Sequence, residues 1–190
     1  PDPLDLWSGV ALKAVERQRW DLVVSTAGPY GVHAPAYALR RQGRASRWIA
    51  DWRDLWVDSQ IFPGLPGFRV IERWLEKRWC LCADVVTTVS QPLADVLRAK
   101  YGDKVHVIYN GFDPEDYAQL ATEPAFALDG VLRIVYTGTI YAGKQDPKPL
   151  FRALAELSAS GAIGPDKVQV LFCGHNANVN DLAQREDVSG

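Results

Sequence analysis

The chain has 190 residues, with 21 Lys and Arg against 23 Asp and Glu, and therefore a formal net charge of −2. This balance gives no reason to expect an electrostatic nucleic-acid binder, and 47% hydrophobic with 23% charged residues is unlike a disordered chain. The longest apolar runs, such as Val168–Cys173, are far too short to cross a bilayer. Three cysteines cannot all pair with one another, which indicates a reducing compartment.

Predicted helices alternate with short strands along the chain. In chain order we predict a helix at 10–19, a strand at 22–26, a helix at 32–42, a strand at 48–51, a helix at 68–82, a strand at 84–89, a helix at 92–100, and strands at 104–108 and 132–137, then a helix at 149–159 and a strand at 168–173. Most strands are near-continuous apolar runs, which are typical of strands covered on both faces. Gly43 is a typical helix stop, and Ser90 before Gln91-Pro92 is a typical helix start. The pattern predicts an α/β fold with a mostly parallel sheet.

The alternation pauses between Asn110 and Gly130, where two prolines and two glycines interrupt the pattern. We predict a first domain at 1–110, an interdomain hinge at 111–130 and a second domain at 131–190. The second piece holds too few elements to bury a sufficient core alone, so we expect it to be cut short. The chain has no Met and opens directly before a predicted helix, so we expect it to be a piece of a longer protein.

Open α/β sheets bind ligands beyond the carboxyl ends of their strands, so the loops there hold the candidate site residues. After the first predicted strand, two glycines allow close approach of the backbone, and His33 falls in the first turn of the next helix, directed at the crevice. An ordinary turn with a surface histidine is the alternative. After the second strand, Arg53 and Asp54 lie between Trp52 and Trp56. They form either a wall for a sugar or phosphate, or an ion pair that pins a loop.

A third loop, from Gly138 to Gln145, nearly spells the phosphate-binding sequence G-x-x-x-x-G-K-[ST] after a strand. Gln145 replaces the hydroxyl that would hold Mg²⁺, and the following D-P-K-P sequence prevents a helix from starting at the Gly-Lys pair. These two failures exclude a Walker-type NTPase. Gly138 and Lys144 still suit an anionic group near a helix N-terminus, with a solvated lysine in a turn as the alternative. No His or Cys cluster has zinc spacing, so no metal site is predicted.

Four segments occur in order along nearly the whole chain: IADWRDLW at 49–56, ADVVTTVS at 83–90 with Glu76 before it, VIYNGFDP at 107–114 and YTGTIY at 136–141. Together they resemble the family 4 glycosyltransferases of the GT-B fold. The first resembles the D-x-R-D-P-W segment of that family, the third its hinge phrase and the fourth the opening of its second domain.

The resemblance implies a retaining transferase that moves a sugar from a nucleotide-sugar to an acceptor. It implies two Rossmann-like parallel-sheet domains that face a cleft, with the donor mainly on the second domain, which is truncated here, and the acceptor mainly on the first. These enzymes are generally metal-independent, so no cofactor is expected, and basic side chains stabilise the leaving diphosphate. The implied acceptor is a cell-envelope glycan or glycolipid. The implied location is cytoplasmic, with peripheral association of the whole protein at the inner face of the cell membrane and no nucleic-acid partner.

The resemblance also assigns roles to residues. His33 matches the first-domain histidine that approaches the transferred sugar, and is the predicted catalytic residue. Gly138 matches the glycine that lets the backbone approach the diphosphate, and Lys144 lies near the lysine that contacts it. Four more residues, from the D-x-R-D segment and the hinge phrase, are predicted to line the cleft or to structure its loops: Arg53, Asp54, Asn110 and Asp113.

This sequence departs from the family pattern in places. Leu55 stands where the family phrase usually has Pro, and no Arg follows shortly after Gly138. We expect the Gly-rich acceptor loop and the paired donor glutamates to lie outside these 190 residues, so the chain alone is expected to be inactive. Two alternatives stay open: a non-catalytic α/β ligand-binding or regulatory domain, and a sugar-nucleotide epimerase of GT-B shape.

Overall fold

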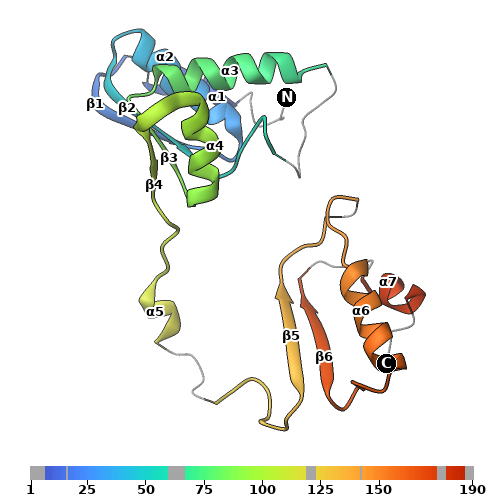
Figure 1. The fold of residues 1–190 in the computed structure, drawn as a ribbon. Helices are drawn as coiled ribbons and strands as arrows, with labels where there is room; N and C mark the ends of the chain where they lie inside the picture. The colour runs from blue at the N-terminus through green and yellow to red at the C-terminus, as the bar shows by residue number, and fades with distance from the viewer. Residues whose placement is uncertain are drawn as a thin grey trace. The chain divides into compact units, whose positions relative to one another are not determined.

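The computed structural model describes residues 7–15, 17–59, 67–118, 123–141, 143–174 and 179–186. The chain divides into two compact units, Pro1–Asp113 and Pro114–Gly190. Each unit has a parallel sheet of its own, four-stranded in the first and two-stranded in the second (Figure 1). The predicted α/β class with parallel sheets is confirmed.

In the first unit each strand pairs with the next strand in the sequence, in the order β1-β2-β3-β4. Its elements are α1 (Trp7–Val15), β1 (Trp20–Thr26), a 3-10 turn (Tyr30–Val32), α2 (His33–Arg41), β2 (Ala45–Trp52), α3 (Arg69–Cys82), β3 (Val85–Thr88), α4 (Gln91–Tyr101), a 3-10 turn (Gly102–Lys104) and β4 (Val105–Val107). Gly43, with φ 67°, follows the end of α2, as predicted. Among the helices only α1 departs clearly from its predicted span, 10–19, and among the strands β2 begins three residues before its predicted span, 48–51.

The core of the first unit lies on one face of its sheet. Trp48, Ala50 and Trp52 alternate along β2 toward this face, and are buried against residues of α2, α3 and α4. Right-handed crossovers between strands in sequential order place these helices on the same side (Figure 1). On the opposite face Leu22 and Val24 are exposed. The prediction of strands covered on both faces is therefore wrong for β1, whereas β3 has the consecutive residues Val86, Thr87 and Thr88 buried, on both of its faces.

The second unit is smaller and more open. It contains α5 (Pro114–Tyr117), β5 (Leu132–Thr137), α6 (Lys148–Ala159), β6 (Val168–Cys173) and α7 (Val179–Arg185). Both strands have the predicted bounds, whereas α5 and α7 were not predicted. Among its described apolar side chains only Phe151 and Val179 are buried. The elements are thus those of a βαβ unit with little core.

Candidate functional site

His33 begins α2, after the loop that follows β1, and its imidazole is fully buried. Its Nδ1 lies 2.7 Å from the Ser25 hydroxyl, which also accepts a hydrogen bond from the Trp48 indole at 2.8 Å. The ring lies 4.4 Å from Trp52, between centroids. The residue has the predicted place in the chain, but its side chain packs into the aromatic core rather than against open solvent.

Burial lowers the pKa of His33 to about 3, so the ring is neutral at physiological pH. A neutral imidazole exchanges hydrogen bonds but carries no charge to a ligand. Its Nε2 has no hydrogen-bond partner among the described residues, and the same holds for Trp52 Nε1 and Thr88 Oγ1. The predicted catalytic role, a hydrogen bond to a sugar, stays a prediction.

A stack of aromatic rings covers this region. The Tyr30 ring lies parallel to that of Trp56 at 5.1 Å, and Trp56 lies parallel to Trp79 at 5.4 Å. The Tyr30 hydroxyl donates to the Leu55 carbonyl at 2.9 Å, which fixes the loop after β2. Burial, with the charges of Asp54 and Glu76, raises the pKa of Tyr30 to about 12. The tryptophans of this stack are packing residues.

A pocket of about 380 Å³ lies on the opposite face of the sheet, at the carboxyl ends of β2, β3 and β4. Apolar side chains and four polar ones line it: Val24, Ile49, Ile108, Asp51, Arg53, Thr87 and Asn110. Arg53 donates to the Asn110 side chain across the mouth, and Thr87 donates to Asp51 at 2.7 Å. Two predicted residues, Arg53 and Asn110, are thereby brought together.

The other two predicted loop residues of the first unit lie elsewhere. Asp54 and Asp113 are exposed and do not line this pocket. Arg53 bonds to Asn110 rather than to Asp54, so the alternative of an Arg53–Asp54 ion pair that pins the loop is wrong.

In the second unit the loop after β5 carries both predicted anion-binding residues. Gly138 has φ 151°, and a Cβ there would lie 3.3 Å from the Tyr136 hydroxyl, so the position favours glycine. The Lys144 amide donates to the Tyr141 carbonyl at 3.0 Å, and the Lys144 side chain is exposed. The Gln145 side chain accepts from the Tyr141 amide at 3.1 Å and closes the loop. Helix α6 starts only at Lys148, so the Walker geometry is absent from this loop.

The model of Glycosyltransferase Family 4 matches residues 3–116, which is more than half of the chain and nearly all of the first unit. The chain belongs to glycosyltransferase family 4. No curated protein sequence matches it. The matched part of this family 4 chain includes His33, Arg53 and Asn110, whereas Gly138 and Lys144 lie beyond it.

Sequence reasoning gave no role to one buried carboxylate of the family 4 unit. Glu76 on α3 is 2% exposed, and it accepts from the Val57 amide at 3.1 Å, Lys100 at 3.1 Å and the Tyr101 hydroxyl at 2.7 Å. These contacts tie the loop after β2 to α3 and α4. The burial of Glu76 could have been inferred from its spacing in the sequence. It lies three and four positions before the apolar Trp79 and Cys80, and therefore on the inner face of the predicted helix.

Two further features bear on the chemistry of the family 4 chain. Within the described ranges, no group of three or more His, Cys, Asp or Glu side chains could hold a metal ion. In the same ranges, every helix is too short or too polar to cross a membrane.

Proposed function

We propose that this chain is part of an enzyme that transfers a sugar from a nucleotide-sugar to an acceptor with retention of configuration. The observation that carries the proposal is the family 4 match over the first unit. The acceptor that we propose is a cell-envelope glycan or a lipid-linked one, and no metal is required.

The second unit is proposed to hold the donor diphosphate. When the sugar leaves, negative charge develops on the diphosphate, and a fixed cation with backbone N–H groups stabilises that charge. Lys144 supplies an exposed cation. Gly138 has no side chain, so a ligand can approach the backbone at the carboxyl end of β5. The donor diphosphate is not assigned to the N-terminus of α6, because the amides of Lys148, Leu150 and Phe151 donate to Asp146 and Pro147.

The pocket of the first unit is proposed to bind a hydroxyl-rich ligand on the acceptor side. Its volume suits a small ligand, and its rim combines a carboxylate, a guanidinium, a hydroxyl and an amide. These groups can donate to and accept from sugar hydroxyls, while the apolar floor of Val24, Ile49 and Ile108 packs against the ring carbons.

The test is kinetic, in the full-length protein that contains this chain. Lys144→Ala should lower kcat about 100- to 1000-fold, the usual effect of losing one preorganised contact to a developing anion. The control is Lys167→Ala. Lys167 is an exposed lysine of the same unit, directly before the amino end of β6, whereas the Lys144 loop follows the carboxyl end of β5. It should keep turnover within about twofold.

Three results would contradict the proposal. Equal activity of the Lys144→Ala and Lys167→Ala variants would remove Lys144 from the donor site. Conversion of the nucleotide-sugar without any acceptor would identify an epimerase. Nucleotide binding without turnover on a broad acceptor panel would favour a non-catalytic ligand-binding domain.

A further inference from the structure

The Ser25 hydroxyl lies between two ring nitrogens. Its Oγ is 2.8 Å from the indole Nε1 of Trp48 and 2.7 Å from Nδ1 of His33. Ser25 belongs to β1, Trp48 to β2 and His33 to the start of α2, so three separate elements meet at this hydroxyl. All three side chains are buried, and in such surroundings water competes little for their hydrogen bonds.

The chemistry of the three groups fixes the direction of both hydrogen bonds. An indole nitrogen can only donate, so Trp48 donates to the Ser25 oxygen. The hydroxyl has one hydrogen, and among the described residues its one acceptor is Nδ1 of His33. If His33 donated from Nδ1 instead, the buried Ser25 hydrogen would have no acceptor in this part of the chain, which costs free energy. Ser25 therefore donates, and Nδ1 carries no hydrogen.

The state of Nδ1 decides the state of the other ring nitrogen. Burial lowers the pKa of His33 to about 3, so near neutral pH the ring carries a single hydrogen. With Nδ1 accepting, that hydrogen is on Nε2, which is therefore a donor and not an acceptor. The bonds from Trp48 to Ser25 and from Ser25 to His33 thus set the tautomer of a histidine whose Nε2 has no partner among the described residues.

The immediate neighbours of the His33 ring also hold unpartnered polar atoms. The Trp52 ring lies 4.4 Å from it, between centroids, and Trp52 is the register partner of Thr88 near the carboxyl ends of β2 and β3. Trp52 Nε1 and Thr88 Oγ1 are buried without a partner among the described residues. Buried polar groups usually have a partner, and ligands of parallel sheets bind beyond these strand ends. An oxygen atom of a ligand would supply the acceptor that the Nε2 hydrogen lacks.

We propose that Ser25 is a positioning residue: together with Trp48 it holds His33 in the tautomer with hydrogen on Nε2, so that His33 meets a sugar oxygen only as a donor. The sugar as ligand rests on the proposed function, whereas the tautomer depends only on contacts inside the first unit. A donor fixed in this way selects a lone pair of a hydroxyl or ring oxygen. It needs no change of protonation when the sugar binds, as a preorganised site requires.

The tautomer is measured by NMR near neutral pH, on the 190-residue chain labelled with nitrogen-15 histidine. Correlations between the ring nitrogens and the carbon-bound ring hydrogens distinguish a protonated nitrogen from a bare one. We expect His33 to show a protonated Nε2 and a bare, hydrogen-bonded Nδ1. Ser25→Ala should shift the Nδ1 resonance to that of a bare nitrogen without a donor, and Ser25→Thr, which keeps the hydroxyl, should restore it. His33→Gln assigns the signals by removing them.

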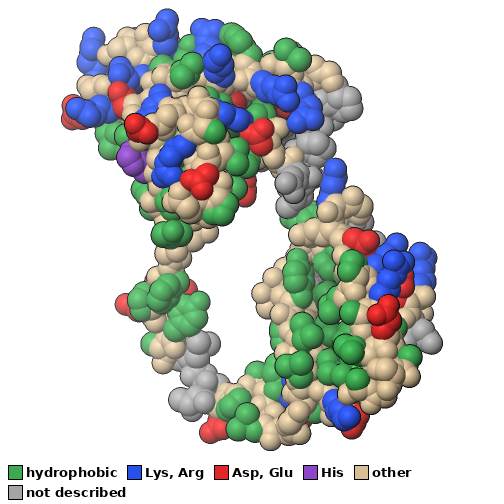
Figure 2. All heavy atoms as spheres, in the orientation of Figure 1, with side chains coloured by type: hydrophobic (Ala, Val, Ile, Leu, Met, Phe, Trp, Pro, Cys, Tyr) green, Lys and Arg blue, Asp and Glu red, His purple; other side chains and the backbone are tan. Residues whose placement is uncertain are grey.

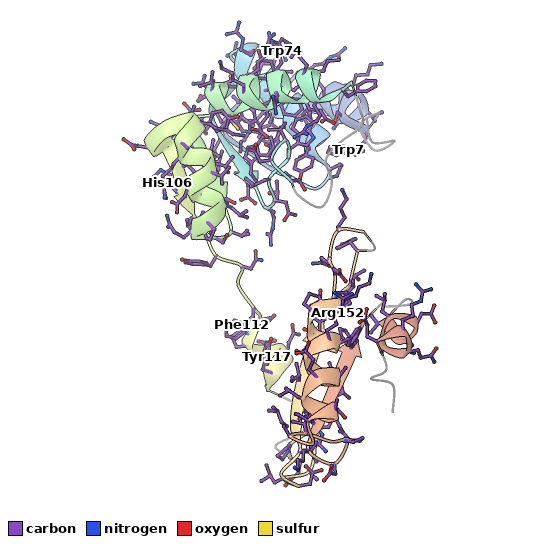
Figure 3. The ribbon with its side chains drawn as sticks, turned by 45° about the vertical axis from the view of Figure 1, so that its right-hand side comes forward. Trp7, Trp74, His106, Phe112, Tyr117 and Arg152 are labelled. Carbon is purple, nitrogen blue, oxygen red and sulfur yellow. The ribbon has the colours of Figure 1, made fainter. Side chains whose placement is uncertain are left out.

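His106 on β4 provides an internal comparison. It is exposed, and Figure 3 shows it at the outside of the first unit; a histidine side chain is also visible on the surface of this unit in Figure 2. Its ring meets water, so we expect it to exchange between tautomers, and Ser25→Ala should leave its signals unchanged. The matched control is Ser46→Ala, which removes an exposed hydroxyl at the amino end of β2 and should leave the His33 signals unchanged.

The contact with the sugar is tested kinetically in the full-length protein that contains this chain. Ser25→Ala should lower kcat about tenfold, which corresponds to about 1.4 kcal/mol of barrier, with little change in KM for the nucleotide-sugar. Ser25→Thr should recover most of this loss, and Ser46→Ala should stay within about twofold. In a His33→Gln background Ser25→Ala should have no further effect on kcat, because Ser25 acts through the His33 ring.

The proposal is overturned if His33 carries its hydrogen on Nδ1, or if Ser25→Ala leaves the Nδ1 resonance in place. It is also overturned if the losses of kcat in Ser25→Ala and His33→Gln add, because Ser25 would then act on the fold and not through the ring. If the full-length protein transfers no sugar, the proposed function fails and the sugar contact with it, while the NMR experiment still decides the tautomer. Thermal unfolding shows whether each variant is folded at the assay temperature.

Discussion

The side chains in contact with His33 are neutral: the Ser25 hydroxyl and the rings of Trp48, Trp52 and Trp79. None of them offsets the cost of placing a charge on the imidazole, so burial acts alone and moves its pKa from 6.5 to about 3. Between these two values the unfolded chain binds a proton that the folded chain does not. Stability contributed by the neutral ring is therefore full above pH 6.5 and falls as the pH drops below that value.

We predict that the free energy of unfolding decreases by about 2 kcal/mol between pH 8 and pH 5 because of His33. Urea unfolding at several pH values measures the effect. His33→Gln should remove this pH dependence, whereas His106→Gln, at an exposed site, should keep it. Asp84 has a pKa below its usual 3.8, so its effect falls outside this range. If the free energy of unfolding changed equally with pH in the unchanged chain and in His33→Gln, the prediction would be contradicted, because His33 would then bind protons in the folded chain.

Among the secondary-structure elements, α3 holds two of its neighbours in place. Its inner carboxylate, Glu76, holds the loop after β2 through the Val57 amide and holds α4 through Lys100 and Tyr101. Lys100 also pairs with Asp58 of the same loop. Burial tends to lower the pKa of Lys100, but the hydrogen bond to Asp58 and the charge of Glu76 raise it overall. Val57 and Asp58, in the loop that carries Arg53, are thereby held by α3 and α4.

Removal of the Glu76 carboxylate should destabilise the first unit. We expect Glu76→Ala to cost about 3 kcal/mol, because the Val57 amide and the Tyr101 hydroxyl lose their acceptor and Lys100 loses one of two anions. Glu76→Gln should cost less, since the amide oxygen still accepts. The control is Glu72→Gln, one turn earlier on the same helix, which should stay within about 0.5 kcal/mol. Denaturant unfolding followed by tryptophan emission measures all three, and equal losses at both positions would contradict the network.

Strands and turns could be predicted because their signals are local. The apolar runs of β5 and β6 gave both bounds, and Gly43 gave the end of α2. The α1 prediction failed at both ends, since 16–19 contain good helix formers and no start signal marks Trp7. Burial of His33 could not be predicted, because it depends on the rings of β2 and α3 that close over it. The Arg53–Asn110 contact joins residues 57 positions apart, which no local pattern encodes.

At the scale of the whole molecule, the two units differ in how much they bury. Trp48, Trp52 and Leu97 are among the large side chains fully buried in the first unit, while the second unit has only Phe151 and Val179 among its described buried apolar residues. Small cores give small stability. All seven tryptophans belong to the first unit, so tryptophan emission reports on that unit alone, whereas far-UV circular dichroism also detects α6 and α7.

We therefore predict two unfolding transitions. In a urea titration the circular dichroism signal should begin to fall at lower concentration than the tryptophan emission changes, because the second unit unfolds first. Phe151→Ala should move only the early transition, and Leu97→Ala only the late one, each by about 2–5 kcal/mol. Superimposed curves from both probes would show that the chain unfolds as one cooperative unit.

The strand order has a consequence for synthesis. Every strand of both sheets pairs with a neighbour in the sequence, so β2 finds β1 already outside the ribosome, and β3 and β4 find their predecessors in turn. At about 5–20 residues per second, each new βα segment follows the last by a few seconds, which is long compared with the time needed to form a helix. The four described strands of the first unit can therefore add to one another in sequence order during translation.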